Sequence, residues 1–183
     1  METKYIIIAV IVLIVLYLIS AYNALTKLKA KVEESFSTMD VYLKKRFDLI
    51  PNVVETVKGY TKHERETLNE LISLRAKSYS NQSIDEKMET SAKISQSINK
   101  LIAVAENYPD LKASENFRDL SAQLKRIEDE IANARKYYNA TVRKYNTKTA
   151  VFPSNLVAKL FGFKPMRMFE ATETERQAVK VSF

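Results

Sequence analysis

The sequence predicts an all-α protein, in which an N-terminal single-pass transmembrane helix leads into an antiparallel four-helix up-down bundle of long, coiled-coil-like helices. Three observations support this fold class. No charged residue lies between Lys4 and Lys27. The 183 residues include two glycines and four prolines, which is too few for sheets joined by tight turns. The remaining sequence repeats apolar residues at alternating steps of three and four, as amphipathic helices do.

The uncharged segment is long enough to cross a membrane. A helix rises about 1.5 Å per residue, so the segment spans about 30 Å, the thickness of a bilayer core. Tyr5, Tyr17 and Tyr22 lie toward its two ends, where aromatic rings favour the headgroup region. We therefore predict a transmembrane anchor over residues 1–22. The residues predicted to span the membrane are Ile6, Ile7, Ile8, Val10, Ile11, Val12, Leu13, Ile14, Val15, Leu16, Leu18 and Ile19.

A cleaved signal peptide is the alternative interpretation of this segment. Signal peptides have an apolar stretch of about 7–15 residues, which is shorter than the stretch found here. The sequence Ser20-Ala21-Tyr22-Asn23-Ala24 also fits a cleavage site poorly. A retained anchor is therefore favoured. The chain has no cysteine, which excludes disulfides, thiolate catalysis and a cysteine-linked lipid.

The charges beside the anchor predict its orientation. Lys27, Lys29 and Lys31 follow the anchor, whereas the N-terminal side carries Lys4, Glu2 and the α-amine. Cytoplasmic flanks of membrane helices are enriched in lysine and arginine. We therefore expect a cell-membrane protein with its bundle on the cytoplasmic side.

Four amphipathic helices are predicted in a bundle domain of residues 23–150. The first covers residues 25–47, and no obvious helix breaker separates it from the anchor. A proline disfavours helical conformation in the residue before it, so Pro51 predicts a turn over residues 48–52, with a kink as the alternative. The other helices are predicted over residues 52–79, 84–107 and 114–150. The last has the most regular apolar seam, formed by Phe117, Leu120, Leu124, Ile127, Ile131, Ala134, Tyr138, Val142 and Tyr145.

A short amphipathic segment is predicted at residues 151–169, before a polar tail at 170–183. Ser154 is a candidate N-cap for a short helix, and Gly162 a candidate residue to end it. In an up-down bundle the fourth helix returns to the bilayer, so we expect this segment to contact the membrane surface. Packing against the base of the bundle or a neighbouring subunit is the alternative. The predicted contact residues are Lys148, Phe152, Leu156, Lys159, Leu160, Phe161, Phe163 and Lys164.

Catalytic, cofactor and metal sites are not predicted. The single histidine, His63, has Thr67 where a zinc protease motif needs a second histidine. Basic residues beside tyrosines in the fourth helix resemble a nucleic-acid site. However, Tyr138 and Tyr145 fall on the apolar seam and are expected in the core, so no nucleic acid partner is predicted. Three apolar residues beside the seams, Phe36, Ile72 and Ile102, are candidates for self-association.

Several segments in order along the chain resemble the LemA family of bacterial membrane-anchored proteins. They include Tyr22-Asn23-Ala24-Leu25, Val32-Glu33-Glu34-Ser35-Phe36, Asp48-Leu49-Ile50-Pro51-Asn52, Tyr108-Pro109-Asp110-Leu111, Phe152-Pro153-Ser154-Asn155 and Phe161-Gly162-Phe163. The resemblance implies one membrane helix, a helical bundle, and no established enzymatic activity or cofactor. It also implies a link to membrane organelle formation, and to a membrane metalloprotease whose gene often accompanies those of the family.

These observations together predict a non-enzymatic, membrane-anchored scaffold. Its expected partners are the lipid bilayer and further copies of itself. The alternative function is an adaptor or regulator of a membrane metalloprotease or another envelope protein. An enzyme is disfavoured because the sequence lacks a recognisable nucleophile–base or metal constellation.

Overall fold

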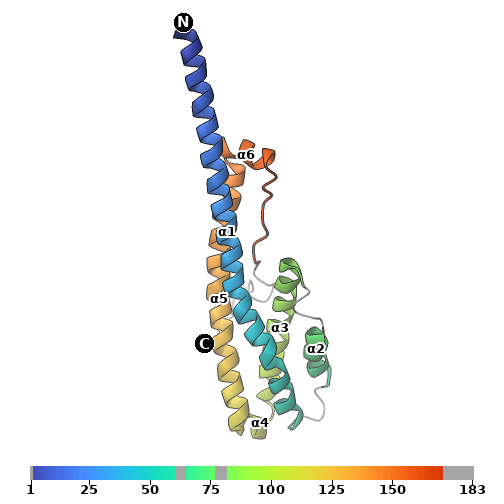
Figure 1. Cartoon of the computed structure of the whole chain (residues 1–183). Coiled ribbons are helices and arrows are strands. Elements are labelled where there is room, and N and C mark those ends of the chain that lie inside the picture. Colours follow the sequence, from blue (N-terminus) through green and yellow to red (C-terminus); the bar gives the residue numbers. More distant parts are fainter. Residues whose placement is uncertain (1, 61–64, 77–81, 171–183) are drawn as a thin grey trace, which may run out of the picture. The chain divides into compact units, whose positions relative to one another are not determined.

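The structure is a computed structural model of the chain, and it describes residues 2–60, 65–76 and 82–170. The described residues form helices and no strands, which confirms the all-α class (Figure 1). The helices are α1 (Glu2–Lys58), α2 (Arg65–Ala76), α3 (Ile84–Ala105), α4 (Pro109–Ala113), α5 (Glu115–Ala150) and α6 (Ser154–Leu160). His63 lies outside the described residues, as does nearly all of the predicted polar tail.

The chain divides into two compact units, to which α1 and α5 both contribute. Unit 1 comprises Met1–Ser37 and Lys136–Met168. Unit 2 comprises Thr38–Arg135 and the chain from Phe169 onward.

Helix α1 passes through Pro51, so the predicted turn at residues 48–52 is wrong. A proline inside a helix costs about 3 kcal/mol or more, because it removes a hydrogen bond and clashes with the preceding turn. Here Phe47, Ile50, Val53 and Val54 are all buried around it. Each buried side chain of this size contributes about 1.5–3 kcal/mol, so packing outweighs the local penalty.

The predicted helix over residues 52–79 is also wrong. Helix α1 ends at Lys58, and the shorter α2 begins at Arg65. Gly59 follows α1 directly, and glycine is a poor helix former because of its backbone entropy. The predictions for residues 84–107 and 114–150 agree with α3 and α5 within two residues at each end. A capping box supports the start of α3, because Ser83 and Glu86 bond to each other's backbone N–H.

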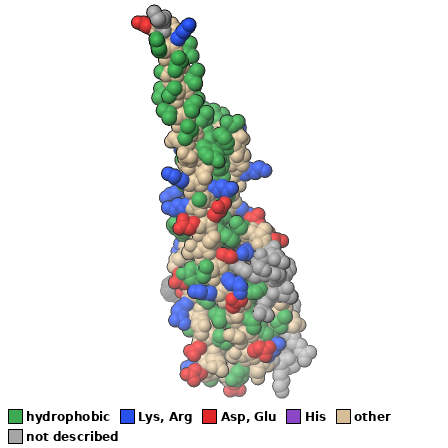
Figure 2. All heavy atoms as spheres, viewed as in Figure 1, with side chains coloured by type: hydrophobic (Ala, Val, Ile, Leu, Met, Phe, Trp, Pro, Cys, Tyr) green, Lys and Arg blue, Asp and Glu red, His purple; other side chains and the backbone are tan. Residues whose placement is uncertain are grey.

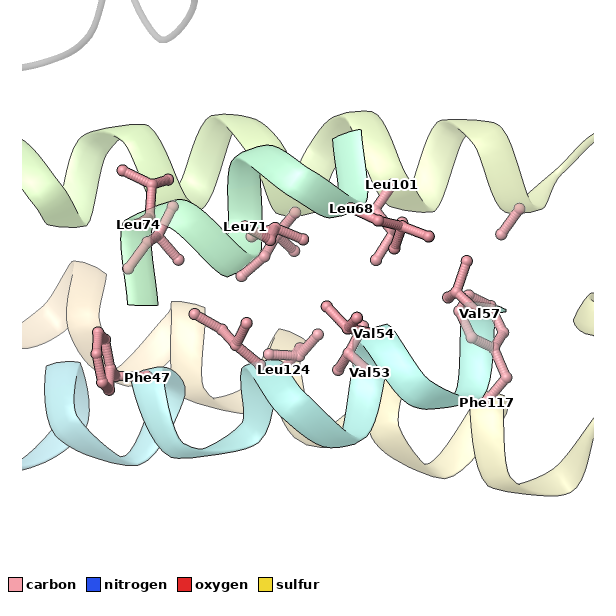
Figure 3. Close-up of a cluster of buried hydrophobic side chains, with 14 of the residues drawn as sticks. Phe47, Val53, Val54, Val57, Leu68, Leu71, Leu74, Leu101, Phe117 and Leu124 are labelled. Carbon is pink, nitrogen blue, oxygen red and sulfur yellow. The ribbon is translucent and has the colours of Figure 1, made fainter. Parts of the chain in front are cut away.

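Buried apolar side chains of α1, α2, α3, α4 and α5 form the core of unit 2. Figure 3 shows ten of them labelled, directed toward one another between the helices. The predicted α5 seam is confirmed, since all of its members are buried or half-buried. The buried cluster comprises Phe47, Ile50, Val53, Val54, Val57, Leu68, Leu71, Leu74, Ile94, Ile98, Leu101, Ala105, Leu111, Phe117 and Leu124.

Side-chain pairs give the relative directions of the helices within unit 2. Asp40 pairs with Lys87 at 2.8 Å, and Arg46 bonds to Ser91 and Ser95 further along α3. Helices α1 and α3 therefore run in the same direction here. Ser95 bonds to Glu128, whereas the earlier Ser91 bonds to the later Arg135, so α5 runs opposite to α3.

In unit 1, α1 and α5 pack in opposite directions. The hydroxyl oxygens of Ser35 and Thr141 lie 2.9 Å apart, and the rings of Phe36 and Tyr138 meet edge to face at 5.9 Å. Phe36 is 7% exposed, so its prediction as a self-association residue is wrong. A strict three-four seam leaves Phe36 on the surface of its helix. The buried side of α1 is wider than such a seam and includes Phe36. Tyr138 and Tyr145 are buried, as the seam predicts.

Candidate membrane-contact site

The N-terminal part of α1 exposes an apolar surface. All the residues predicted to span the membrane are exposed except Leu18, which is half-buried. Figure 2 shows hydrophobic side chains over this part of α1. Among the described residues, α1 is the one helix that is long and apolar enough to cross a membrane, by length and composition. The continuation of this helix into the packed part of the chain is confirmed.

Packing in unit 1 begins where the apolar stretch ends. Ala21 is 4% exposed and Leu25 is completely buried, whereas Ile19 is 53% exposed. Tyr22 lies at this transition with a half-exposed ring. The change from exposed to buried apolar residues therefore falls between Ile19 and Leu25.

Helix α6 is fixed to the end of α5. The Ser154 hydroxyl donates to the carbonyls of Lys148 and Val151, at 2.7 and 3.0 Å. Ser154 is thus the first helical residue and not the predicted N-cap, a position that Pro153 takes. Its hydroxyl donates to carbonyls at and just after the end of α5, whereas the side chain of an N-cap accepts a hydrogen bond from a backbone N–H of its own helix. Val157 and Ala158 are buried, so one side of α6 packs inward.

Gly162 ends α6 as predicted. Its φ of 73° is a left-handed conformation that glycine adopts without strain. The N–H of Phe163 then reaches back to the carbonyl of Ala158 at 2.9 Å, as in a Schellman motif. This turn brings the two flanking phenylalanines to α1.

Two aromatic contacts connect α6 to the end of the apolar stretch. The Tyr22 ring meets Phe161 at 4.9 Å and Phe163 at 5.7 Å, both edge to face. Edge-to-face pairs at such distances contribute about 0.5–1.5 kcal/mol each beyond the apolar area that they bury. Figure 1 shows α6 beside α1, where the unpacked part of α1 begins. The structure thus brings the two sets of predicted membrane residues together.

The outward side of this segment is apolar. Phe152 is 77% exposed, Leu156 57%, Leu160 71% and Phe161 53%. Of the other predicted contact residues, Lys159 and Lys164 are exposed, whereas Lys148 and Phe163 are half-buried. The four exposed apolar residues are called the α6 apolar face below: Phe152, Leu156, Leu160 and Phe161.

The chain after α6 is held along α5 by side-chain bonds to its backbone. Tyr145 donates to the carbonyl of Lys164 at 3.0 Å, and Tyr138 donates to that of Arg167 at 3.0 Å. Burial raises the pKa of the Tyr145 phenol, which keeps the donor protonated. Asn146 bonds to both the N–H and the carbonyl of Met166, each at 2.9 Å. Asn146 is not predicted from the sequence, because no motif distinguishes it from a surface asparagine.

A buried arginine in unit 2 is a second polar site that the sequence analysis missed. Arg46 is 1% exposed and forms an ion pair with Glu128 at 2.6 Å. Its guanidinium also donates to the Ser95 hydroxyl at 2.6 Å and to both the hydroxyl and the carbonyl of Ser91. Arg135 donates to the same Ser91 hydroxyl at 3.2 Å. These five side chains are called the Arg46 cluster below.

The seam spacing contains a signal for this cluster. Arg46 follows Leu43 by three residues and precedes Ile50 by four, so it occupies a seam position of α1. Ser91 and Ser95 stand where α3 lacks large side chains, a gap that suggests a close approach of another helix. In the structure, the Arg46 guanidinium of α1 approaches α3 at this gap.

The comparisons with known proteins identify the family. The family model described as "LemA family" matches residues 35–183. This chain belongs to the LemA family. The matched region begins within α1 and includes the Arg46 cluster and the α6 apolar face.

Relatives of this LemA-family chain include a protein named LemA and magnetosome proteins. "Protein LemA" of Metamycoplasma hominis is 29% identical over 162 residues, which are 87% of this chain and 74% of that protein. "Magnetosome protein MamQ 2" of Paramagnetospirillum magneticum is 33% identical over 73 residues, or 40% of this chain and 27% of that protein. "Magnetosome protein MamQ" of Magnetospirillum gryphiswaldense is 29% identical over 72 residues, 26% of its length.

Many of the described polar side chains of this LemA-family chain form hydrogen bonds within and between helices. Among residues 2–60, 65–76 and 82–170, no group of three or more histidine, aspartate or glutamate side chains is placed to hold a metal ion. The site combines an apolar helix, a short apolar face beside it and exposed lysines, which are groups suited to contact with a membrane surface.

Proposed function

We propose that this LemA-family chain is a non-enzymatic scaffold, anchored in the cell membrane by α1 and assembled from several copies. One observation carries the proposal: the exposed apolar part of α1 continues without a break into the packed helices. The helix that carries the exposed apolar stretch is thus also the helix that packs against α5 in unit 1. The names of the magnetosome relatives add support for a role at a membrane.

The helical domain of the scaffold is an antiparallel four-helix up-down bundle formed by α1, α2, α3 and α5. The opposite directions of α3 and α5, and the shared direction of α1 and α3, support this arrangement. The Arg46 cluster is structural in this account. Its arginine, serines and glutamate bond to one another, as buried polar groups do when they specify how helices pair.

The helical domain lies on the cytoplasmic side of the membrane. Lys27, Lys29 and Lys31 are exposed just beyond the apolar stretch, and such residues are enriched on cytoplasmic flanks. Because the chain has no cysteine, a single Ala132→Cys variant reports the side. We expect an impermeant maleimide to label it only after the cells are opened, whereas labelling of intact cells would place the domain outside.

Self-assembly is the testable part of the scaffold proposal. Ile72 and Ile102 remain about 40% exposed on the packed helices α2 and α3, and they are candidates for contacts between copies. We expect the full chain, purified in mild detergents, to form particles well above its 21.0 kDa monomer mass in light scattering. The double variant Ile72→Glu/Ile102→Glu should reduce particle size, because it places charges in the proposed contact.

The matched control for self-assembly is Ala132→Glu, at an exposed position of α5. It should assemble like the wild type. A monomer in every detergent would contradict the scaffold. Particles that form only after a second membrane protein is added would instead favour the alternative function, an adaptor of a membrane metalloprotease or another envelope complex.

A further inference from the structure

We propose that the α6 apolar face rests in the headgroup region of the leaflet at which the packed part of α1 begins. The chain would then hold the membrane at two points: the span of α1 and the surface contact of α6. The partner is a lipid surface that contains anionic headgroups. This inference rests on the proposed membrane anchoring, and the experiment below distinguishes failure of the one from failure of the other.

The level of α6 is set by its contacts with Tyr22. At about 1.5 Å per residue, Tyr22 lies about 26 Å along α1 from Tyr5, close to the thickness of a bilayer core. A helix that spans the bilayer between these two tyrosines places Tyr22 near the headgroups. Since Phe161 and Phe163 touch the Tyr22 ring, α6 is held at the same depth.

The composition of the face fits a lipid surface. Four large apolar side chains are exposed within ten residues of one another, and Lys159 and Lys164 are exposed among them. Interfacial segments combine an apolar face, which enters the boundary between headgroups and acyl chains, with cations that meet anionic lipids. The inward residues Val157 and Ala158 are already buried and Phe161 packs on Tyr22, so Phe152, Leu156 and Leu160 are surplus to the packing of unit 1.

The face is also held rigidly before any contact with lipid. Two bonds from Ser154 fix the start of α6, and the Gly162 turn fixes its end. The bonds of Asn146 to Met166 then hold the following chain on α5. A preformed face loses little conformational freedom on docking, which favours a stable contact.

Single-tryptophan variants of the full chain test the proposal, because the chain has no native tryptophan. Leu160→Trp reports the α6 face, Ile11→Trp the middle of the span, and Tyr137→Trp an exposed position of unit 1 on α5. Each variant is reconstituted in phosphatidylcholine vesicles that contain phosphatidylglycerol. The lipids carry bromine, a fluorescence quencher, either near the headgroup end or near the far end of the acyl chains.

We expect Leu160→Trp to be quenched most by the shallow bromines, Ile11→Trp most by the deep bromines, and Tyr137→Trp by neither. A further variant adds Phe152→Asp and Leu156→Asp to Leu160→Trp. Both residues are exposed, so the fold should persist while the apolar contact is lost. About half or more of the shallow quenching should disappear, because interfacial docking scales with buried apolar area.

Three results would overturn the contact of α6 with lipid. Leu160→Trp could be quenched no more than Tyr137→Trp. Its emission could be blue-shifted yet unquenched, which would show that a second copy of the chain covers the face. The added aspartates could leave the quenching unchanged, which would show proximity without docking. In each case Ile11→Trp decides separately whether the anchoring stands, since its quenching by deep bromines depends on the span alone.

Discussion

Replacing Ile131 with aspartate is expected to destabilise unit 2 by about 4 kcal/mol or more. Ile131 is 1% exposed on the seam of α5, so the substitution removes a packed side chain and buries a carboxylate. Single domains are stable by about 5–15 kcal/mol, so a loss of this size removes much of the total. Thermal unfolding followed by circular dichroism should show a fall in Tm of about 10 °C or more.

Ala132→Asp is the matched control for this substitution. It introduces the same side chain one position further along α5, where the residue is exposed. Only the difference in helix propensity between alanine and aspartate remains, about 0.7 kcal/mol. If the two variants melted within a few degrees of each other, the seam of α5 would not be the core of this unit.

Removing the anion of the Arg46 cluster is expected to have the second-largest effect. In Glu128→Gln the Arg46 guanidinium stays buried without its carboxylate. Breaking a buried ion pair costs about 3–5 kcal/mol, and we expect the lower end of that range because the Glu128 side chain is 31% exposed. Glu130→Gln, at an exposed position of α5, is the control and should have almost no effect.

A double-mutant cycle separates this charge effect from simple loss of packing. Arg46→Met leaves Glu128 at a partly exposed edge, where water can solvate it, so this variant should lose less stability than Glu128→Gln. Adding Glu128→Gln to Arg46→Met should then cost little further, giving a coupling energy of about 2 kcal/mol. Additivity of the two single effects within about 0.5 kcal/mol would show that the ion pair does not contribute to stability.

The sequence predicts α5 best, for a clear physical reason. Residues such as Phe117, Leu124 and Ile131 follow an unbroken three-four spacing, and no proline or glycine interrupts it. Local pattern and tertiary burial therefore indicate the same helix. The apolar N-terminal part of α1 is equally clear, because a long uncharged stretch has few alternative structures.

The errors in α1 follow from Pro51. The local rule for proline favours a turn, but the burial of Phe47, Ile50 and Val53 keeps the helix intact. A turn at residues 48–52 would place Arg46 in the last turn of a helix, where a basic residue is common, so the turn conceals its seam position. The packing around Pro51 thus explains both errors: the length of α1 and the burial of Arg46.

Part of the candidate site could be predicted and part could not. The apolar and basic composition of the segment after α5 indicates a membrane surface contact, and four of its apolar residues are exposed. The contacts of Tyr22 with Phe161 and Phe163 join residues far apart in the sequence. No local pattern specifies such a pairing, so the depth of α6 relative to α1 required the structure.

The central claim is that the apolar part of α1 is a retained membrane anchor. The most direct test measures the intact mass of the protein from cells, after the membrane fraction has been washed with alkaline carbonate. We expect the full chain, with its N-terminal apolar helix, to remain in the washed membranes. A mature protein that begins near Ala21 or Ala24 and is recovered in the soluble fraction would contradict it.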